Sequence, residues 1–352
     1  MMSYKTDDLR IVDVREVVPY AELQAEFPVT ENAARTTHET RKAIHRLLRG
    51  EDDRVLVVVG PCSIHDPDAA LEYAGRLKKV AQQLSDDLLI VMRVYFEKPR
   101  TTVGWKGLIN DPDLDGSFRI NKGLRLARKL LLDLNDSGVP AATEYLDLMS
   151  PQYVSDLISW GAIGARTTES QVHRELASGL SCAVGFKNGT DGALKIAIDA
   201  ARSASQPHSF MALTKAGRSA IFSTSGNEDC HIILRGGKDP NYDAESVAAA
   251  SEQLEAAGLQ AQLMIDFSHG NSRKQFSRQL DVAKDVAAQI AAGDARIVGA
   301  MIESHLKEGR QDCHPGVELE YGKSITDACA GWEDTVPLLE QLADAVRQRR
   351  SV

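Results

Sequence analysis

Eight short apolar runs, separated by longer stretches with helical periodicity, constrain the fold of this chain most strongly. Runs that are apolar throughout are typical of parallel strands covered on both faces. The predicted strands cover residues 55–59, 89–94, 140–143, 162–165, 183–186, 231–234, 263–265 and 297–302. Eight strand–helix repeats predict an α/β fold of the (β/α)8 TIM-barrel type, with a doubly wound open sheet as the alternative.

Several helix boundaries can also be predicted from the sequence. Asp66 precedes Pro67, which combines a capping carboxylate with proline at the first helical position. Thr168 and Gln171 have the spacing of a capping box. Further helices are predicted over residues 31–48 and 332–349.

Two segments lie outside the eightfold repeat. Residues 1–50 precede the first strand and form an N-terminal extension, which we expect to make regulatory or oligomer contacts. Residues 208–224 contain two β-type runs around a short glycine-containing turn, a pattern that predicts a hairpin. The segment 225–230 is too short for a crossover helix. We therefore predict a catalytic barrel over residues 51–352, with a β-hairpin inserted before its sixth strand.

The charge balance limits the classes of partner. The chain has 41 Lys and Arg against 50 Asp and Glu, a net charge of −9, which argues against a nucleic-acid binder. No apolar run approaches the roughly 18 residues of a membrane span, and the N-terminus lacks the apolar core of a signal peptide. The five scattered cysteines fit a reducing compartment. The sequence therefore predicts a soluble, cytoplasmic protein with no membrane or nucleic-acid partner.

Basic residues recur where the predicted strands end, which is where barrel enzymes carry their chemistry. These residues are Arg93, Lys98, Arg100, Arg166, Lys187 and Arg235. Their mutual repulsion would make such a cluster costly unless anions bind to it. Arg suits bidentate contact with phosphate or carboxylate. The cluster therefore indicates two anionic substrates, or one with charge at both ends.

A possible metal site overlaps this basic cluster. Cys62, His269 and Glu303 follow predicted strands 1, 7 and 8, which become neighbours when a barrel closes, and Asp327 lies in a later loop. This mixture of soft and hard ligands suits one divalent ion of Mn, Fe, Co, Zn or Cu. From spacing alone, a buried cysteine among unrelated polar groups remains the alternative.

Long blocks of the sequence resemble one enzyme family. The blocks are Gly60-Pro-Cys-Ser-Ile-His65, Arg93-Val-Tyr-Phe-Glu-Lys-Pro-Arg-Thr-Thr102, Gly164-Ala-Arg-Thr-Thr-Glu-Ser170, Gly185-Phe-Lys-Asn-Gly-Thr190, Ile233-Leu-Arg-Gly-Gly237 and Asp266-Phe-Ser-His269. They are similar to the class I 3-deoxy-D-arabino-heptulosonate 7-phosphate (DAHP) synthases of the shikimate pathway, in their long microbial feedback-regulated form. The resemblance covers essentially the whole chain.

The resemblance implies a reaction and its site residues. The reaction is a metal-dependent condensation of phosphoenolpyruvate with D-erythrose 4-phosphate and water, which gives DAHP and phosphate. The implied metal ligands are Cys62, His269, Glu303 and Asp327. The implied phosphoenolpyruvate contacts are Arg93, Lys98, Arg166, Lys187 and Arg235, and the sugar-phosphate contacts are Arg100 and Thr101, with Pro99 shaping the turn. Lys98 is the candidate proton donor, and Lys187, Glu144 or a metal-bound hydroxide could assist the addition of water.

The resemblance also implies feedback inhibition by an aromatic amino acid in a homodimer or homotetramer. The effector would bind between the hairpin and neighbouring helices, helped by the N-terminal segment of another subunit. The matching positions are Asp7, Asp8, Leu148, Gln152, Leu180, Ser181, Phe210, Ala212 and Phe222. The block that begins at Asp7 favours phenylalanine. Ala212 stands where Ser is expected in phenylalanine-sensitive relatives and Gly in tyrosine-sensitive ones, so tyrosine and tryptophan stay open.

Three other functions are alternatives to this synthase. The first is a related synthase that condenses phosphoenolpyruvate with arabinose 5-phosphate, and both the residues from Lys98 to Thr102 and the predicted hairpin argue against it. The second is an aldolase that forms a Schiff base on Lys187, and the third is a metabolite sensor without catalysis. A complete set of metal ligands argues against both.

Overall fold

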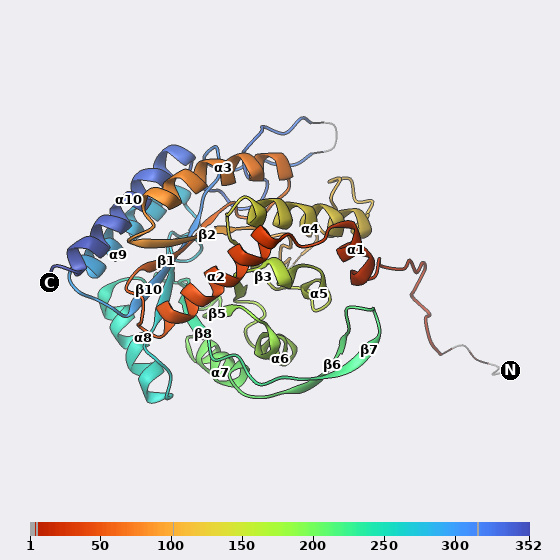
Figure 1. Cartoon of the computed structure of the whole chain (residues 1–352), viewed down its shortest axis with the longest axis horizontal. Coiled ribbons are helices and arrows are strands. Elements are labelled where there is room, and N and C mark those ends of the chain that lie inside the picture. Colours follow the sequence, from red (N-terminus) through yellow and green to blue (C-terminus); the bar gives the residue numbers. More distant parts are fainter. Residues whose placement is uncertain (1–3, 5, 101, 315–316) are drawn as a thin grey trace.

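The computed structural model describes residue 4 and residues 6–100, 102–314 and 317–352. Within these residues, eight parallel strands close into a barrel in the order β1-β10-β9-β8-β5-β4-β3-β2 (Figure 1). The strands are β1 (Val55–Gly60), β2 (Leu88–Arg93), β3 (Ala141–Glu144), β4 (Trp160–Ile163), β5 (Ala183–Lys187), β8 (Cys230–Leu234), β9 (Leu263–Asp266) and β10 (Ile297–Glu303). The predicted barrel is confirmed, and the open sheet is excluded because β1 pairs with β10.

The barrel has an inner and an outer apolar layer because successive side chains of a strand point to opposite faces. On β1, Leu56 and Val58 belong to the inner layer, while Val55, Val57 and Val59 pack on the surrounding helices. Met264 and Met301 on β9 and β10 extend the inner layer. The barrel centre is thus a packed core that holds the strand ends rigidly.

Helices cover the outside of the barrel. They are α1 (Tyr20–Glu26), α2 (Glu31–Leu48), α3 (Pro67–Gln83), α4 (Ile120–Asp136), α5 (Pro151–Val154), α6 (Gln171–Gly179), α7 (Lys195–Ala204), α8 (Ala244–Ala256), α9 (Gln279–Ala291) and α10 (Trp332–Arg349), with 3-10 turns η1 (Ser155–Leu157) and η2 (Phe276–Arg278). The predicted bounds of α2 and α10 are confirmed. In the described part of the chain, no helix is both long and apolar enough to cross a bilayer.

Two predicted helix starts had different outcomes. The carboxylate of Asp66 accepts hydrogen bonds from the backbone N–H groups of Asp68 and Ala69, so this cap is confirmed. The capping box at Thr168 is wrong, because Ser170 is the N-cap of α6 and makes no side-chain cap. Thr168 is instead buried, and its hydroxyl lies 2.9 Å from the carbonyl oxygen of Lys187 at the end of β5.

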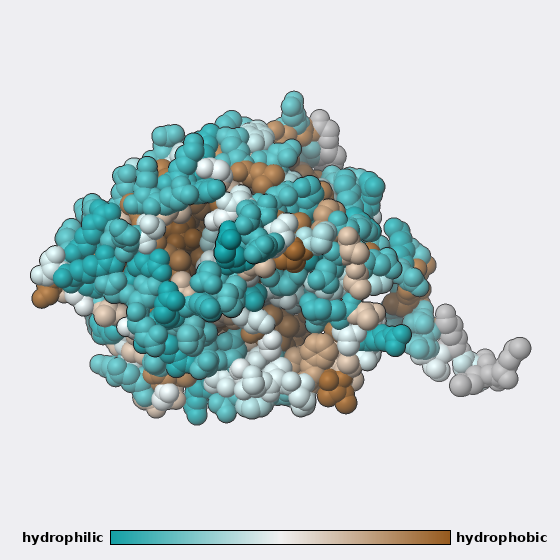
Figure 2. Space-filling model, viewed as in Figure 1, coloured by the Kyte–Doolittle hydropathy of each residue, from teal (hydrophilic) through white to brown (hydrophobic). Residues whose placement is uncertain are grey.

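The inserted hairpin is confirmed as a separate antiparallel sheet of β6 (Ser209–Leu213) and β7 (Ser219–Ser223). In Figure 1 it forms an arm that curves past α6. Its two faces differ: Phe210 and Phe222 pair on one face at 6.3 Å between ring centroids, whereas Met211 and Ile221 on the other are 88% and 78% exposed. Figure 2 shows apolar side chains gathered over the hairpin on an otherwise largely hydrophilic face.

The N-terminal extension meets the rest of the fold at Glu16 and Val18: the side chain of Asn121 in α4 donates to the carbonyl oxygen of Glu16 and accepts from the N–H of Val18. Residues 6–17 are exposed, and Figure 1 shows them leaving the body of the molecule. The hydroxyl of Tyr20 in α1 donates to Asp156, which also accepts from the buried Arg128 of α4. In α2, Ile44 and Leu47 join the inner core of the barrel. The extension therefore shares its packing with the barrel, and its assignment as a functional unit stays a prediction.

Candidate active site at the carboxyl end of the barrel

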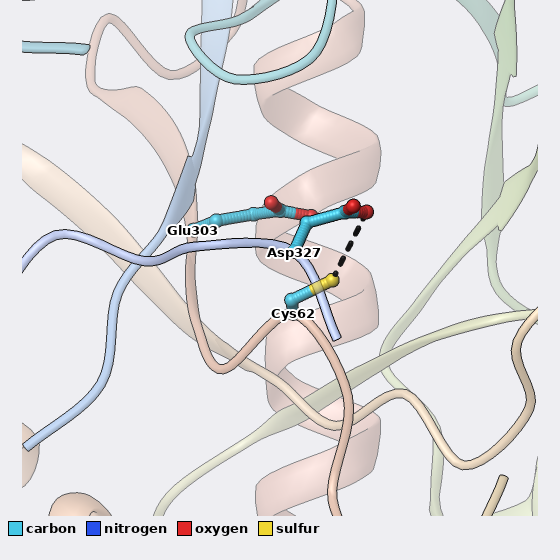
Figure 3. Close-up of side chains that lie close together, drawn as sticks. All are labelled: Cys62, Glu303 and Asp327. Carbon is cyan, nitrogen blue, oxygen red and sulfur yellow. Dashed lines mark hydrogen bonds between the residues drawn. The ribbon is translucent and has the colours of Figure 1, made fainter. Parts of the chain in front are cut away.

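Three of the four predicted metal ligands meet at the seam where the barrel closes. Cys62 follows β1, Glu303 ends β10, and Asp327 lies in the loop between β10 and α10. Gly60 and Glu303 are register partners, so barrel closure itself brings these strand ends together. The Cys62 sulfur and one carboxylate oxygen each of Glu303 and Asp327 all lie within 4.8 Å of one another (Figure 3).

His269, the fourth predicted ligand, lies at the edge of this group. Its Nε2 atom is 3.9 Å from Oε1 of Glu303. Its Nδ1 atom is 2.8 Å from Oγ of Ser268, whose hydroxyl donates to Oδ1 of Asp266. Because the single hydroxyl proton of Ser268 is used in that bond, Nδ1 of His269 carries the proton that links it to Ser268. In the neutral ring the lone pair is then on Nε2, the atom 3.9 Å from Oε1 of Glu303.

The donor set fits a divalent transition-metal ion. A thiol and two carboxylates converge, the imidazole of His269 lies 3.9 Å from Glu303 at the edge of this group, and hydrogen bonds through Ser268 and Asp266 orient the imidazole. Ligating histidines typically have such a partner on their second nitrogen. Cys62, Glu303, Asp327 and His269 would hold the ion.

The ammonium of Lys98 lies against two of these ligands. Its Nζ atom donates to Sγ of Cys62 and to Oδ2 of Asp327, each at 2.8 Å. Burial disfavours the charge of Lys98, but the surrounding Cys62, Glu303 and Asp327 outweigh it and raise the pKa of the ammonium. Burial likewise opposes ionisation of Asp327, yet Lys98 holds the pKa of this carboxyl below its usual range. Lys98 therefore stays protonated next to the ligand group.

The pKa of the Cys62 thiol is raised, whereas that of the neighbouring Asp327 carboxyl is lowered. Burial, followed by the charge of Glu303, raises the pKa of Cys62 in spite of Lys98. The thiol consequently keeps its proton, and its sulfur lies 3.6 Å from Oδ2 of Asp327 as a donor. A bound cation would remove that proton, since a coordinating thiol is deprotonated.

The predicted cationic residues surround the same mouth. Arg93 is buried, and its guanidinium donates to Oε1 of Glu303 at 3.0 Å. Lys187 is buried at the end of β5 and pairs with Asp266 at 2.9 Å. Burial lowers the pKa of Arg235, with Asp266 opposing the shift and the cation Arg166 reinforcing it. These four cations thus lie around the predicted ligands, as expected for an anion site.

The predicted sugar-phosphate contacts belong to the loop after β2. Arg166 donates to the carbonyl oxygen of Pro99 at 3.3 Å, which links this loop to the end of β4. Arg100 is exposed, and its Nε donates to the carbonyl oxygen of Trp105 within the loop. Thr101 lies outside the described residues.

Two acidic residues flank this loop. Glu144 ends β3, and a Cβ atom on Gly164 would lie 2.2 Å from its Oε1, so glycine leaves room for this carboxylate. Glu97 is buried and accepts a hydrogen bond from the hydroxyl of Ser150 at 2.9 Å. Burial, reinforced by the charge of Asp147, raises the pKa of Glu97 to about 7.

Sequence reasoning missed the polar residues that support the site. Asp266 is fully buried and contacts both Lys187 and His269, a role that its place in the Asp266–His269 block does not predict. The buried amides of Asn188 and Asn271 bind the carbonyl oxygens of Gly236 and Asp266. A usable signal existed for Asp266, because an acidic residue at the end of an apolar strand needs a buried cation.

The predicted effector positions fall into two groups. Phe210 and Ala212 of β6 and Phe222 of β7 lie on the hairpin, and Leu180 and Ser181 directly follow α6. Hydroxyls of Ser178 and Thr224, 2.7 Å apart, tie the end of α6 to the hairpin base.

The remaining effector positions lie on other elements than the hairpin and α6. Leu148 lies in the exposed loop after β3, and Gln152 in α5. Asp7 and Asp8 lie in the exposed tail. The structure thus joins the hairpin to α6, and residues 6–17, which include Asp7 and Asp8, are exposed.

Comparison with known proteins identifies the family. Residues 26–340 match the model of the DAHP synthetase I family. The Phe-sensitive phospho-2-dehydro-3-deoxyheptonate aldolase of Escherichia coli (strain K12) is 66% identical over 99% of this chain and 100% of its own length. The Trp-sensitive aldolase of Enterobacter agglomerans is 57% identical over 98% of this chain and 99% of its own length.

A solved structure supports the same assignment. The phospho-2-dehydro-3-deoxyheptonate aldolase of Francisella tularensis SCHU S4 superposes with a TM-score of 0.95 at 53% identity, over 97% of this chain and 99% of that one. Together with the closed barrel and the inserted hairpin, these matches confirm the resemblance. The chain therefore belongs to the DAHP synthetase I family and is a 3-deoxy-7-phosphoheptulonate synthase.

Proposed function

We propose that this enzyme condenses phosphoenolpyruvate with D-erythrose 4-phosphate and water by a metal-dependent reaction. The observation that carries the proposal is the convergence of Cys62, Glu303 and Asp327 within 4.8 Å, at a barrel mouth that also holds the buried cations Arg93, Lys187 and Arg235. In the reaction, C3 of phosphoenolpyruvate bonds to the aldehyde carbon, whose oxygen takes up a proton. Water adds at C2, and inorganic phosphate leaves.

A divalent ion held by Cys62, His269, Glu303 and Asp327 would supply a Lewis acid that polarises the aldehyde oxygen. The protein residues do the remaining work. Arg93, Arg166, Lys187 and Arg235 bind the phosphate and carboxylate of phosphoenolpyruvate, since fixed cations suit two anionic groups on one small molecule. The loop that carries Pro99, Arg100 and Thr101 binds the phosphate of the sugar.

Lys98 is the proposed proton donor to the nascent alkoxide. Its Nζ atom lies 2.8 Å from two ligand atoms, and therefore next to the place where the aldehyde oxygen would be held. The raised pKa keeps the proton available until negative charge develops on that oxygen. Lys187 and Glu144 are the candidates to assist the addition of water. Lys187 ends β5 and Glu144 ends β3, with β4 between these two strands.

Cys62→Ala tests the metal dependence, with Cys182→Ala as the matched control. Both thiols are buried, but Cys182 precedes β5 at the opposite end of the barrel. Cys62→Ala should bind no divalent metal, by elemental analysis, and should release phosphate at least about 100-fold more slowly. Cys182→Ala should behave as wild type. Full turnover of Cys62→Ala in metal-free buffer would refute the proposal.

We also propose that an aromatic amino acid inhibits the enzyme, with phenylalanine favoured over tyrosine and tryptophan. The aromatic pair Phe210–Phe222 and the tie between the hairpin and α6 support a site beside the hairpin. The exposed tail supports a contribution of Asp7 and Asp8 to a second subunit, in a homodimer or homotetramer. The higher identity to a Phe-sensitive relative than to a Trp-sensitive one favours phenylalanine.

Removal of residues 1–12 tests this regulation. Inhibition by phenylalanine should disappear while most turnover remains, because the described residues of this segment, 6–12, are exposed. Wild-type enzyme assayed with each of the three amino acids identifies the effector, and light scattering gives the subunit number. Unchanged inhibition of the truncated enzyme would contradict the proposed role of the tail.

A further inference from the structure

We propose that Asp266 is a positioning residue that holds the metal ligand His269 and the substrate-binding Lys187 in one fixed arrangement. This inference rests on the proposed metal-dependent function. Asp266 is the last residue of β9 and is fully buried. Its Oδ2 atom lies 2.8 Å from Nδ1 of His269 and 2.9 Å from Nζ of Lys187.

The second carboxylate oxygen completes the arrangement. Oδ1 of Asp266 accepts hydrogen bonds from the backbone N–H of Ser268 at 3.0 Å and from its hydroxyl at 2.6 Å. The same hydroxyl lies 2.8 Å from Nδ1 of His269. One carboxylate thus fixes the turn that carries the histidine and, together with Ser268, the proton on Nδ1.

This network has a direct consequence for metal binding. With Nδ1 protonated, the free lone pair of His269 is on Nε2, the atom 3.9 Å from Oε1 of Glu303. His269 also has a backbone φ of 53°, an uncommon conformation for a residue with a side chain. Packing and hydrogen bonds must hold such a turn in place. The N–H of Lys274 donates to the carbonyl oxygen of His269, and the carboxylate of Asp266 adds its two bonds from Ser268 and its contact with Nδ1.

The contact with Lys187 connects the metal side of the site to the substrate side. Lys187 comes from β5, on the other side of β8 from β9, and its ammonium is buried. A buried charge without a partner is costly, so the position of this ammonium depends on Asp266. Loss of the carboxylate should therefore weaken both metal binding and the binding of phosphoenolpyruvate.

Asp266→Asn tests the role because it keeps the shape of the side chain and removes its charge. The matched control is Asp87→Asn, since Asp87 is also buried and paired with two cations, Arg347 and Arg350. Asp87 directly precedes β2, at the opposite end of the barrel. Thermal unfolding of each variant reports whether it is folded.

The primary measurement is calorimetric titration of metal-free protein with Mn²⁺. We expect Asp266→Asn to bind Mn²⁺ about 10- to 100-fold more weakly than wild type, as for other residues that orient metal-ligating histidines. The KM for phosphoenolpyruvate should rise at saturating Mn²⁺, and Asp87→Asn should match wild type in both measurements. Wild-type Mn²⁺ affinity in folded Asp266→Asn, or an equal loss in the control, would overturn the proposal.

A measurement on the wild-type protein covers the case in which Asp266→Asn does not fold. In metal-free protein labelled with ¹⁵N-histidine, the ring of His269, assigned with His269→Gln, should carry its proton on Nδ1. A proton on Nε2 would overturn the proposal. Cys62→Ala separates the two levels of inference: if it binds Mn²⁺ as wild type does, the metal site itself is wrong. If Cys62→Ala loses Mn²⁺ while Asp266→Asn keeps it, the site stands and the role of Asp266 fails.

Discussion

The Nζ atom of Lys98 lies 2.8 Å from the Sγ atom of Cys62, within the group of predicted metal ligands. Since this ammonium also contacts Asp327, it neutralises part of the negative charge of the ligands. The proposed proton donor and the proposed metal ligands are therefore parts of one cluster, and a change to Lys98 should affect chemistry more than folding.

Lys98→Met should lower kcat by about 100- to 10,000-fold, the usual contribution of a positioned general acid. Phosphate release from both substrates gives kcat, and elemental analysis gives the metal content, which should stay at the wild-type level. Lys78→Met on α3 is the control, because that residue lies on the outer helical layer. A wild-type kcat for Lys98→Met would show that another group protonates the alkoxide.

Glu97→Gln should change how stability depends on pH. The folded protein raises the pKa of Glu97 from 4.5 to about 7, so between these values the folded state binds more protons than the unfolded state. The stabilisation is complete below pH 4.5 and is lost as pH rises through 7. Glutamine has no charge to bury, so the variant does not lose this stabilisation at high pH. At pH 8 its free energy of unfolding should exceed that of wild type by at most about 3 kcal/mol.

Urea unfolding of wild type and Glu97→Gln at pH 5 and pH 8 measures this difference. Glu72→Gln is the control, because Glu72 lies on the exposed face of α3. If the difference in unfolding free energy between wild type and Glu97→Gln is the same at both pH values, Glu97 does not titrate in this range.

Arg128→Met should destabilise the fold by about 3 kcal/mol, since it leaves a partner of a buried ion pair uncompensated. Arg128 is fully buried and bonds to both carboxylate oxygens of Asp156, which also accepts from Tyr20 of the extension. Arg125→Met on the same helix removes a more exposed pair with Glu26, which solvent screens, and should destabilise the fold clearly less than Arg128→Met does. Chemical denaturation gives the free energy of unfolding of both variants. Equal losses would contradict a larger contribution of the buried Arg128 pair.

Gly107→Ala should impair catalysis by moving the loop that carries Lys98. Gly107 has a φ of 118°, and a Cβ atom there would lie 2.0 Å from the carbonyl oxygen of Phe96. Gly116 also has a positive φ, yet no atom lies within 4 Å of its Cβ position, so Gly116→Ala tests backbone strain alone. The KM for erythrose 4-phosphate should rise in Gly107→Ala, and wild-type kinetics there would show that the loop tolerates the shift.

The barrel could be predicted because its strands are buried on both faces and therefore stand out as apolar runs. The same pattern located Cys62 and Glu303, since the first and last strands of a closed barrel must be neighbours. The predicted capping box at Thr168 is wrong because its buried hydroxyl donates to the carbonyl oxygen of Lys187 at the end of β5. Local spacing in the sequence does not reveal this long-range contact. Asp266 was overlooked because its partners Lys187 and His269 come together only in the folded barrel.

The pairing of β1 with β10 has a consequence for how the enzyme is made. Cys62 and Asp327 are 265 residues apart in the chain, so a ribosome has already synthesised most of the protein before both can take part. An unfinished chain consequently has no assembled site with which to capture metal or substrate. Once β10 and the following loop with Asp327 are in place, an ion held by these residues and Cys62 would link the first strand to the last, and metal uptake would report the completion of the barrel.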